Sequence, residues 1–189
     1  MAITKPTPKE NFYFSRYIDL TSGDDLIYAL DKSRMSMMET LGKLSDQQSN
    51  YKYQEGKWTV KEVLSHCIDT ERVLAYRAMC FSRNEIAELP DFDQDRYVKE
   101  DMASEQQLSN LLEEYDLVRR TTVLLFKRMK AENLDFSGIA SNTEITPREL
   151  GWAIAGHDLH HLNVLREKYL VDNLSLIHIS EPTRQLQIA

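Results

Sequence analysis

Three histidines lie close together near the end of the chain, in the segment AGHDLHHLNVL: His157, His160 and His161. His157 and His161 are four residues apart, so on a helix they lie on one face with Cβ atoms about 6 Å apart. Two imidazoles at this spacing can bind one metal ion, as they do on the helices of zinc proteases. His160 is rotated by about 100° from His161 around a helix, and we expect it to point elsewhere.

His66 is the candidate for a third ligand. It lies in WTVKEVLSHCIDTER, at the edge of the apolar face of a predicted helix, and it is the only other histidine before residue 174. Each histidine alone could be a buried structural residue, but three on apolar faces of two facing helices favour a metal site. Three imidazoles leave coordination positions open, which is typical of catalytic sites. Zinc, nickel, iron and manganese all bind imidazole, so the identity of the divalent ion stays open.

Three charged residues near these histidines each have two interpretations. Asp69 either holds a ligand imidazole by a hydrogen bond or pairs with Arg72, one turn further on. Arg77 lies on the same helix line as His66, and is either exposed to solvent or orients an anionic substrate. Asp95 lies in a long acidic segment that forms either a surface turn or a lid over the site. Cys67, beside His66, is expected to be a core residue.

The elements that carry these residues are predicted to be helices. Apolar residues at helical spacing indicate four long helices, at about residues 24–44, 59–82, 104–129 and 146–170. Three of their starts have the residues of a capping box: Thr59 with Glu62, Ser104 with Gln107, and Thr146 with Glu149. No stretch alternates with the period of a strand. The predicted fold is therefore all-α, an up-down four-helix bundle with a long loop between helices two and three, onto which the aromatic segment ENFYFSRYIDL packs.

Composition limits the class of protein. The chain has 189 residues and a formal net charge of -7, which predicts one domain and argues against a nucleic-acid partner. No apolar run has the length of a membrane span, and the N-terminus lacks the apolar core of a signal peptide. The two cysteines, Cys67 and Cys80, would lie about 20 Å apart on one helix and cannot pair. We therefore expect free thiols in the reducing environment of the cytoplasm.

The C-terminal segment is predicted to have a different origin from the rest of the chain. Residues 174–184, LSLIHISEPTR, are identical to one reading frame of a transposase sequencing-library adapter. A natural tail would require an eleven-residue coincidence. We therefore predict a domain at residues 1–173 and a non-native tail at residues 174–189, and we exclude His178 from the candidate ligands.

The motifs described above occur in an order that resembles the DinB-like family of bacterial proteins. The resemblance rests on Trp58, Thr59, Glu62, Leu64 and His66, on the LPDFD segment at residues 89–93, and on Gly156, His157 and His161. It extends from about Asp24 to Leu170. It implies a four-helix bundle that is often dimeric, with a divalent metal ion held by the same three histidines that the spacing selects.

The resemblance also narrows the chemistry. Characterised relatives include S-transferases that use a low-molecular-weight thiol such as bacillithiol and a thiol-dependent maleylpyruvate isomerase, while many others are described as metal-dependent hydrolases. Our hypothesis is an enzyme in which the metal activates water or such a thiol for attack on a small electrophile. The alternative is a non-enzymatic bundle whose metal or histidines stabilise the fold or bind a ligand. The resemblance is compatible with a homodimer in both cases.

Overall fold

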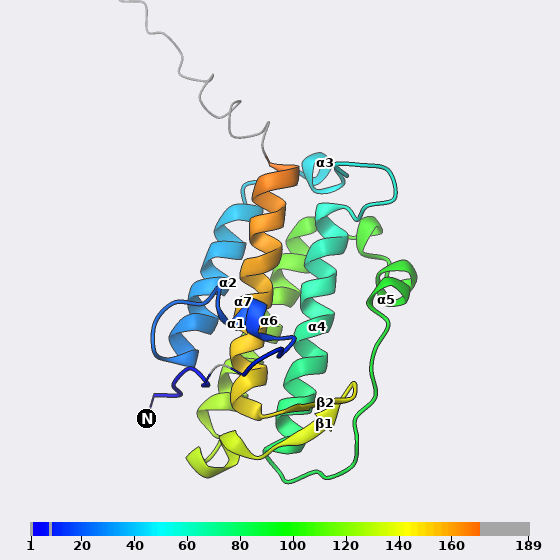
Figure 1. The fold of residues 1–189 in the computed structure, drawn as a ribbon. Helices are drawn as coiled ribbons and strands as arrows, with labels where there is room; N and C mark the ends of the chain where they lie inside the picture. Colours follow the sequence, from blue (N-terminus) through cyan, green and yellow to red (C-terminus); the bar gives the residue numbers. More distant parts are fainter. Residues whose placement is uncertain (1, 8, 171–189) are drawn as a thin grey trace, which may run out of the picture.

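Four long helices form the body of the molecule in the computed structural model, which describes residues 2–7 and 9–170 (Figure 1). They are α2 (Leu26–Leu41), α4 (Val60–Phe81), α6 (Leu108–Lys127) and α7 (Pro147–Val164). Around the bundle, α7 packs against α2 and α4, and α6 packs against the same two helices from the other side. The predicted all-α four-helix bundle is confirmed.

The long connection between α4 and α6 determines how the helices are directed. It contains α5 (Gln94–Glu100) and the single turn η1 (Ala103–Glu105), and it carries the chain back along the outside of the bundle (Figure 1). As a result, α4 and α6 run in the same direction, and α2 and α7 run together in the opposite direction. Simple alternation would instead have made α4 and α6 antiparallel.

Two of the predicted helix starts are confirmed, and one is wrong. Capping boxes begin α4 at Thr59 and α7 at Thr146. In each box the glutamate three residues on, Glu62 or Glu149, accepts a hydrogen bond from the backbone N–H of the threonine. Helix α6 begins at Leu108, four residues after the predicted cap, and Gln107 makes no side-chain capping bond.

A distant residue sets the start of α6. The backbone N–H of Leu108 donates to Oδ1 of Asp46 over 3.2 Å, and the same oxygen accepts the buried Lys61 ammonium at 2.9 Å. Asp46 belongs to the short helix α3 (Asp46–Ser49), far away in the sequence. A tertiary contact with Asp46 therefore caps the start of α6, in place of the local capping box predicted at Ser104.

A small hairpin, which the sequence pattern does not predict, follows α6. Strands β1 (Gly138–Ala140) and β2 (Thr143–Ile145) pair antiparallel, with Gly138 opposite Ile145. Ser141 and Asn142 form the turn with φ values of 54° and 58°, the left-handed conformation that two-residue hairpin turns use. Three-residue strands are too short to show an alternating pattern. The hairpin follows the single turn η2 (Ala131–Asp135) and lies at the end of α4.

The core consists of two apolar clusters separated by a polar layer. One cluster contains Leu30, Leu74, Val123 and Ile154, and the other contains Met37, Ile68, Tyr115 and Leu162. Between them, each long helix contributes one buried polar residue: Ser33, Glu71, Arg119 and Asp158. Leu124 on α6 is 64% exposed, because the buried face of this helix passes through Arg119 instead.

The N-terminal segment packs onto the bundle as predicted. Its short helix α1 (Ser15–Ile18) lies against α7. A Cβ atom on Gly156 would lie only 1.9 Å from the carbonyl oxygen of Tyr17, so this close approach requires glycine at position 156. At its other end, α7 continues into a π-helical turn, Leu165–Tyr169. Within the described residues, no helix combines the length and apolar character needed to cross a membrane. The predicted tail at residues 174–189 lies outside the described residues.

Candidate metal centre

The structure brings the three predicted histidines together. His66 comes from α4, while His157 and His161 come from successive turns of α7, the neighbouring helix. Nε2 of His157 lies 3.2 Å from Nε2 of His66 and 3.2 Å from Nε2 of His161. All three ligand atoms lie within 4.8 Å of one another. Two helices that start far apart in the sequence thus direct three imidazole nitrogens at one point.

This donor set fits a divalent metal ion. Metal–nitrogen bonds of about 2.1 Å, at angles between a right angle and the tetrahedral angle, place ligand nitrogens about 3.0–3.4 Å apart. Hydrogen bonding alone satisfies the cluster less well. A neutral imidazole nitrogen carries either one proton or one lone pair, so Nε2 of His157 can bond to only one of its two neighbours. A single cation, by contrast, accepts a lone pair from all three.

The protonation state of the cluster also suits a cation. Burial lowers the pKa of His66 to about 4, with a smaller contribution from His160. Burial, then His66 and His160, lower the pKa of His161 to about 3. Burial and then His161 lower the pKa of His157 well below its usual range. The three imidazoles are therefore neutral at pH 7, with lone pairs free for a metal ion.

Aromatic side chains surround the cluster. The ring of Trp58 lies 5.0 Å from that of His66, and the ring of Tyr17 contacts His157 edge-on at 5.2 Å. Tyr17 also contacts His160, at 5.5 Å between ring centroids. His160 is not part of the converging set, so it lies beside the site, as its helical angle predicted. The role of Tyr17 was not predicted, because its contact with α7 depends on how α1 folds back.

Three further residues near the cluster were considered from the sequence: Asp69, Cys67 and Asp95. Asp69 forms an ion pair with Arg72 at 3.5 Å, and the hydroxyl of Thr70 is the group that lies 3.5 Å from Nδ1 of His66. Cys67 is fully buried, which agrees with the predicted core position, and burial raises its pKa well above the usual range. Asp95 is exposed on α5 and borders the same hollow as His161. Its role as part of a lid stays a prediction.

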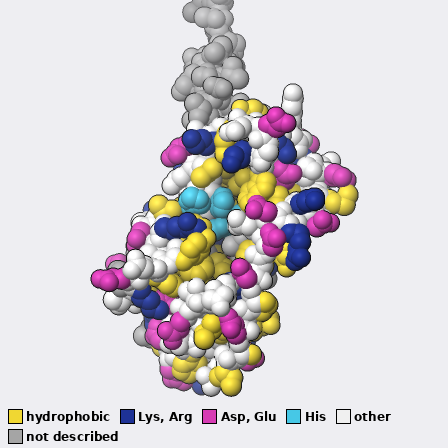
Figure 2. Space-filling view, turned by 45° about the vertical axis from the view of Figure 1, so that its right-hand side comes forward, with side chains coloured by type: hydrophobic (Ala, Val, Ile, Leu, Met, Phe, Trp, Pro, Cys, Tyr) yellow, Lys and Arg dark blue, Asp and Glu magenta, His cyan; other side chains and the backbone are white. Residues whose placement is uncertain are grey.

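Two hollows adjoin the histidine cluster. The larger, a cavity of about 500 Å³, has His157 in its wall, together with residues from α1, α4, the long connection and the hairpin. The smaller, of about 310 Å³, has His160 and His161 in its wall, with Trp58 and Tyr169. Figure 2 shows histidine side chains at the surface of this face, beside a hollow bordered by hydrophobic and charged groups. A small molecule can therefore approach the cluster.

Arg77 lies in the wall of the larger cavity and is only 4% exposed. The solvent-exposed interpretation of this residue is wrong. The hairpin and the segment before α5 fold over α4 at this point, and Nη2 of Arg77 donates to the carbonyl of Pro90 and to Oγ of Ser141. Pro90 and Ser141 both lie outside α4, so the helical pattern of α4 could not predict that they cover Arg77.

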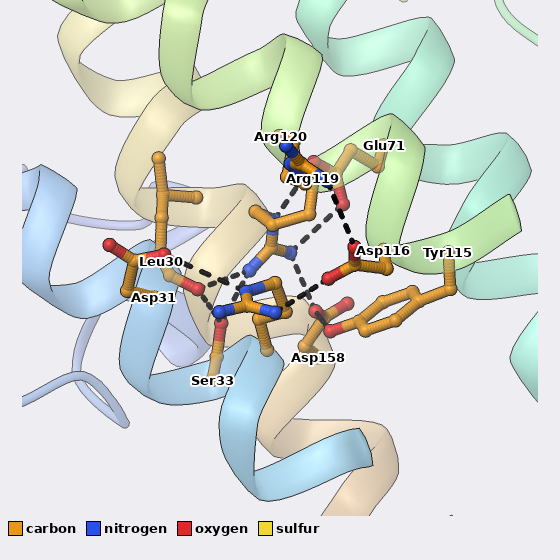
Figure 3. Close-up of polar contacts among 10 residues, drawn as sticks. Leu30, Asp31, Ser33, Glu71, Tyr115, Asp116, Arg119, Arg120 and Asp158 are labelled. Carbon is orange, nitrogen blue, oxygen red and sulfur yellow. Dashed lines mark hydrogen bonds and ion pairs between the residues drawn. The ribbon is translucent and has the colours of Figure 1, made fainter. Parts of the chain in front are cut away.

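The polar layer of the core directly supports the centre, and the motifs in the sequence did not predict it. Arg119 binds both carboxylate oxygens of Glu71 at 2.9 Å and Oδ2 of Asp158 at 2.6 Å, and it also donates to the carbonyl of Leu30 and to Ser33 (Figure 3). The hydroxyl of Tyr115 donates to Asp158. Because Asp158 follows His157 directly, the network fixes this turn of α7. An available signal was the position of Arg119, four residues from both Tyr115 and Val123 on one helix face.

Comparison with known proteins identifies the family. The sequence model of the DinB superfamily matches residues 29–165, well over half of the chain, including all three histidines. The chain belongs to the DinB superfamily. A curated relative is 26% identical over 126 residues, which are 66% of this chain and 72% of the relative. It is a protein of Oceanobacillus iheyensis named "Putative metal-dependent hydrolase OB0413".

Solved structures share the DinB fold at low sequence identity. YfiT from Bacillus subtilis, described as a probable metal-dependent hydrolase with an unusual four-helix bundle topology, has a TM-score of 0.69 at 16% identity, covering 90% of this chain and 94% of YfiT. A mycothiol-dependent maleylpyruvate isomerase has a TM-score of 0.62 at 9% identity, covering 73% of this chain and 58% of the isomerase. The DinB-like protein YjoA from B. subtilis has a TM-score of 0.55 at 18% identity, covering 86% and 99% of the two chains.

Proposed function

We propose that His66, His157 and His161 bind one divalent metal ion and that the protein is a metal-dependent enzyme acting on a small molecule. The observation that carries this proposal is the convergence of three neutral imidazoles beside a cavity of about 500 Å³. Nε2 of His157, which is in the wall of that cavity, lies 3.2 Å from Nε2 of each of the other two. Membership of a superfamily that includes a relative named as a metal-dependent hydrolase supports it. Zinc, nickel, iron and manganese all remain candidates, because imidazole binds each of them.

The protein supplies the setting for a nucleophilic attack. A divalent ion held by three histidines lowers the pKa of a bound water or thiol and so favours its nucleophilic form at neutral pH. His157 lines the larger cavity and His161 lines the smaller hollow, so a small molecule bound in either one would lie beside the histidine cluster. Leu74 and the aromatic residues Phe14, Tyr17 and Phe92 line the larger cavity, where they provide an apolar surface for the body of a small electrophile and exclude water.

The nucleophile can be water or a low-molecular-weight thiol. Water corresponds to the hydrolase named among the relatives, and a thiol corresponds to the mycothiol-dependent isomerase that shares the fold. The second hollow, beside His161, gives a thiol cosubstrate a place separate from the electrophile. A homodimer and a cytoplasmic location remain predictions, made from the family resemblance and from the cysteines.

Elemental analysis of three matched proteins tests the metal site. All are purified without an affinity tag that contains histidine. We expect close to one divalent metal ion per chain in the parent protein, about one in His160→Ala, and almost none in His157→Ala. His160 is the matched control, because it is an imidazole on the same helix outside the converging set. His178, outside the described residues, is present in all three proteins, so any metal that it binds does not affect the differences in metal content between them.

The outcomes separate the enzyme from the non-enzymatic alternative. No metal in the parent protein, even after incubation with zinc, nickel and manganese, would refute the metal site. Equal metal loss in both variants would refute the assignment of ligands. The metal-loaded parent is then assayed with a small ester in water and with monochlorobimane plus a thiol. Metal-dependent turnover of one identifies the nucleophile, whereas one metal per chain without a displaceable water favours a structural ion.

A further inference from the structure

A buried arginine lies at the opposite end of the larger cavity from the histidines. Arg77 is on α4, eleven residues after His66, which corresponds to about 16 Å along the helix axis. Thr70 and Leu74, which lie between His66 and Arg77 on α4, form part of the cavity wall. His157 borders the same cavity at the end nearer to His66. The cavity therefore has the imidazole of His157 at one end, a guanidinium at the other, and a mainly apolar surface in between.

The charge of Arg77 has no direct partner of opposite sign. Within residues 2–7 and 9–170, no carboxylate forms an ion pair with it, and its Nη2 donates only to neutral oxygens, the carbonyl of Pro90 at 2.7 Å and Oγ of Ser141 at 2.9 Å. Burial lowers the pKa of Arg77 below its usual range, and Asp91 partly offsets this effect. A buried guanidinium stays charged, and burying it without a counter-charge costs free energy.

The other donors of the guanidinium are available to a ligand. Nε and Nη1 of Arg77 form no hydrogen bond with the described residues. Both atoms remain accessible, because neither is one of the fully buried polar atoms that lack a partner. Because Arg77 lines the cavity, these two groups can donate to a molecule inside it. The two contacts made by Nη2 hold the side chain in place, so the fork is positioned in advance.

Two aspartates also border this cavity, but both are exposed and engaged. Asp91 accepts hydrogen bonds from Ser141 and from the backbone N–H of Phe92. Asp93 caps α5 by accepting from the N–H of Arg96. Exposed carboxylates are screened by water and salt, whereas Arg77 is surrounded by protein. A ligand deep in the cavity therefore experiences the positive charge more strongly than the negative charges at the rim.

We propose that Arg77 binds a carboxylate of the substrate, and that the substrate is an elongated small molecule with an apolar middle and an electrophilic group that reaches the histidines. The planar guanidinium fork matches a carboxylate. This inference rests on the proposed function, because it takes the histidine end of the cavity as the reacting end. It adds the chemical class of the substrate, which neither the metal ligands nor the nucleophile determine.

Binding of a carboxylate and its uncharged isostere tests the proposal. The probes are 4-phenylbutyrate and 4-phenylbutanamide, titrated calorimetrically at pH 7 into the metal-loaded full chain. We expect the parent protein to bind the carboxylate about tenfold more tightly or better, the gain expected of a charge-assisted hydrogen bond. Arg77→Gln should lose this preference and keep its metal. Arg72→Gln, which removes an exposed arginine from the same helix outside the cavity, should keep it.

Further variants separate this proposal from metal binding. Arg77→Lys keeps the charge without the fork and should show a smaller preference, which also covers the case that Arg77→Gln fails to fold. No preference in the parent protein, or a parental preference in both Arg77 variants, overturns the proposal. A preference lost in His161→Ala but kept in Arg77→Gln also overturns it, since the carboxylate would then bind the metal. The metal content of each protein is measured separately, so that failure of the proposed metal site is distinguished from failure of Arg77 to bind the carboxylate.

Discussion

His157 is the residue on which the candidate centre depends most. Its Nε2 contacts both other imidazoles, it lies in the wall of the larger cavity, and the next residue, Asp158, is bound to the buried Arg119. His157 and Asp158 together therefore link the histidine cluster, the cavity and the buried polar layer of the core. The spacing of four residues between His157 and His161 was sufficient to predict that these two converge, because helix geometry alone determines it.

The lowered histidine pKa values predict how the centre responds to acid. Protons compete with a metal ion for the same lone pairs, but only at pH values near or below the pKa of the ligand. With pKa values of about 4 for His66 and about 3 for His161, metal content should stay constant from pH 7 to about pH 5 and fall as the pH approaches 4. Elemental analysis after equilibration at each pH measures this, with circular dichroism as a check that the protein stays folded.

Ordinary histidines give a different profile. An unperturbed imidazole titrates near pH 6.5, so release of metal centred near that pH would contradict the lowered pKa values. It would mean that water reaches the three imidazoles more freely than their burial indicates.

At the scale of the helices, the polar layer ties the bundle together. Arg119 on α6 contacts α2, α4 and α7 at once through Leu30, Glu71 and Asp158 (Figure 3). Arg119→Met would leave two buried carboxylates without their counter-charge, so we expect a loss of about 3–5 kcal/mol in the free energy of unfolding. Chemical denaturation measures the change, and the altered packing of α7 should also reduce metal affinity.

The neighbouring arginine provides the control for this variant. Arg120 is 69% exposed and pairs weakly with Asp116 at 3.8 Å, so Arg120→Met should change the free energy of unfolding by less than about 1 kcal/mol. Similar losses in the two variants would show that the buried network does not stabilise the fold more than a surface ion pair does.

The starts of the helices show which elements can be predicted from sequence. Thr59 and Thr146 cap their helices by bonds to residues three positions on, and such local interactions leave a pattern in the sequence. The start of α6 depends on Asp46, and the hairpin on a turn of two residues in the left-handed conformation. These depend on contacts distant in sequence or on strands of three residues, which a pattern of apolar residues does not contain.

At the scale of the whole molecule, the sequence determined the bundle and the histidine cluster but not the cavity beside it. Helical periodicity places His66 and His157 on inward faces, so they meet in a bundle in which α4 and α7 are neighbours and bring these two positions to the same height. The cavity combines α1, α4, the long connection and the hairpin, four segments brought together only by the tertiary fold. The burial of Arg77 and the approach of Tyr17 to His157 depend on the same assembly.

Removal of the metal should lower the stability of the entire bundle. An ion held by His66, His157 and His161 would join α4 to α7, and it would bind the folded chain because the three histidines converge only there. Free metal at about 100 times its dissociation constant would stabilise the fold by about 2.7 kcal/mol, which for a chain of this size corresponds to a rise of about 5–10 °C in Tm. Differential scanning calorimetry of the loaded and the chelator-treated protein should show this difference. His160→Ala should show the same shift, while His161→Ala should melt at one temperature with or without chelator. A parent protein that loses its metal without any change in Tm would show that the ion does not hold the two helices together.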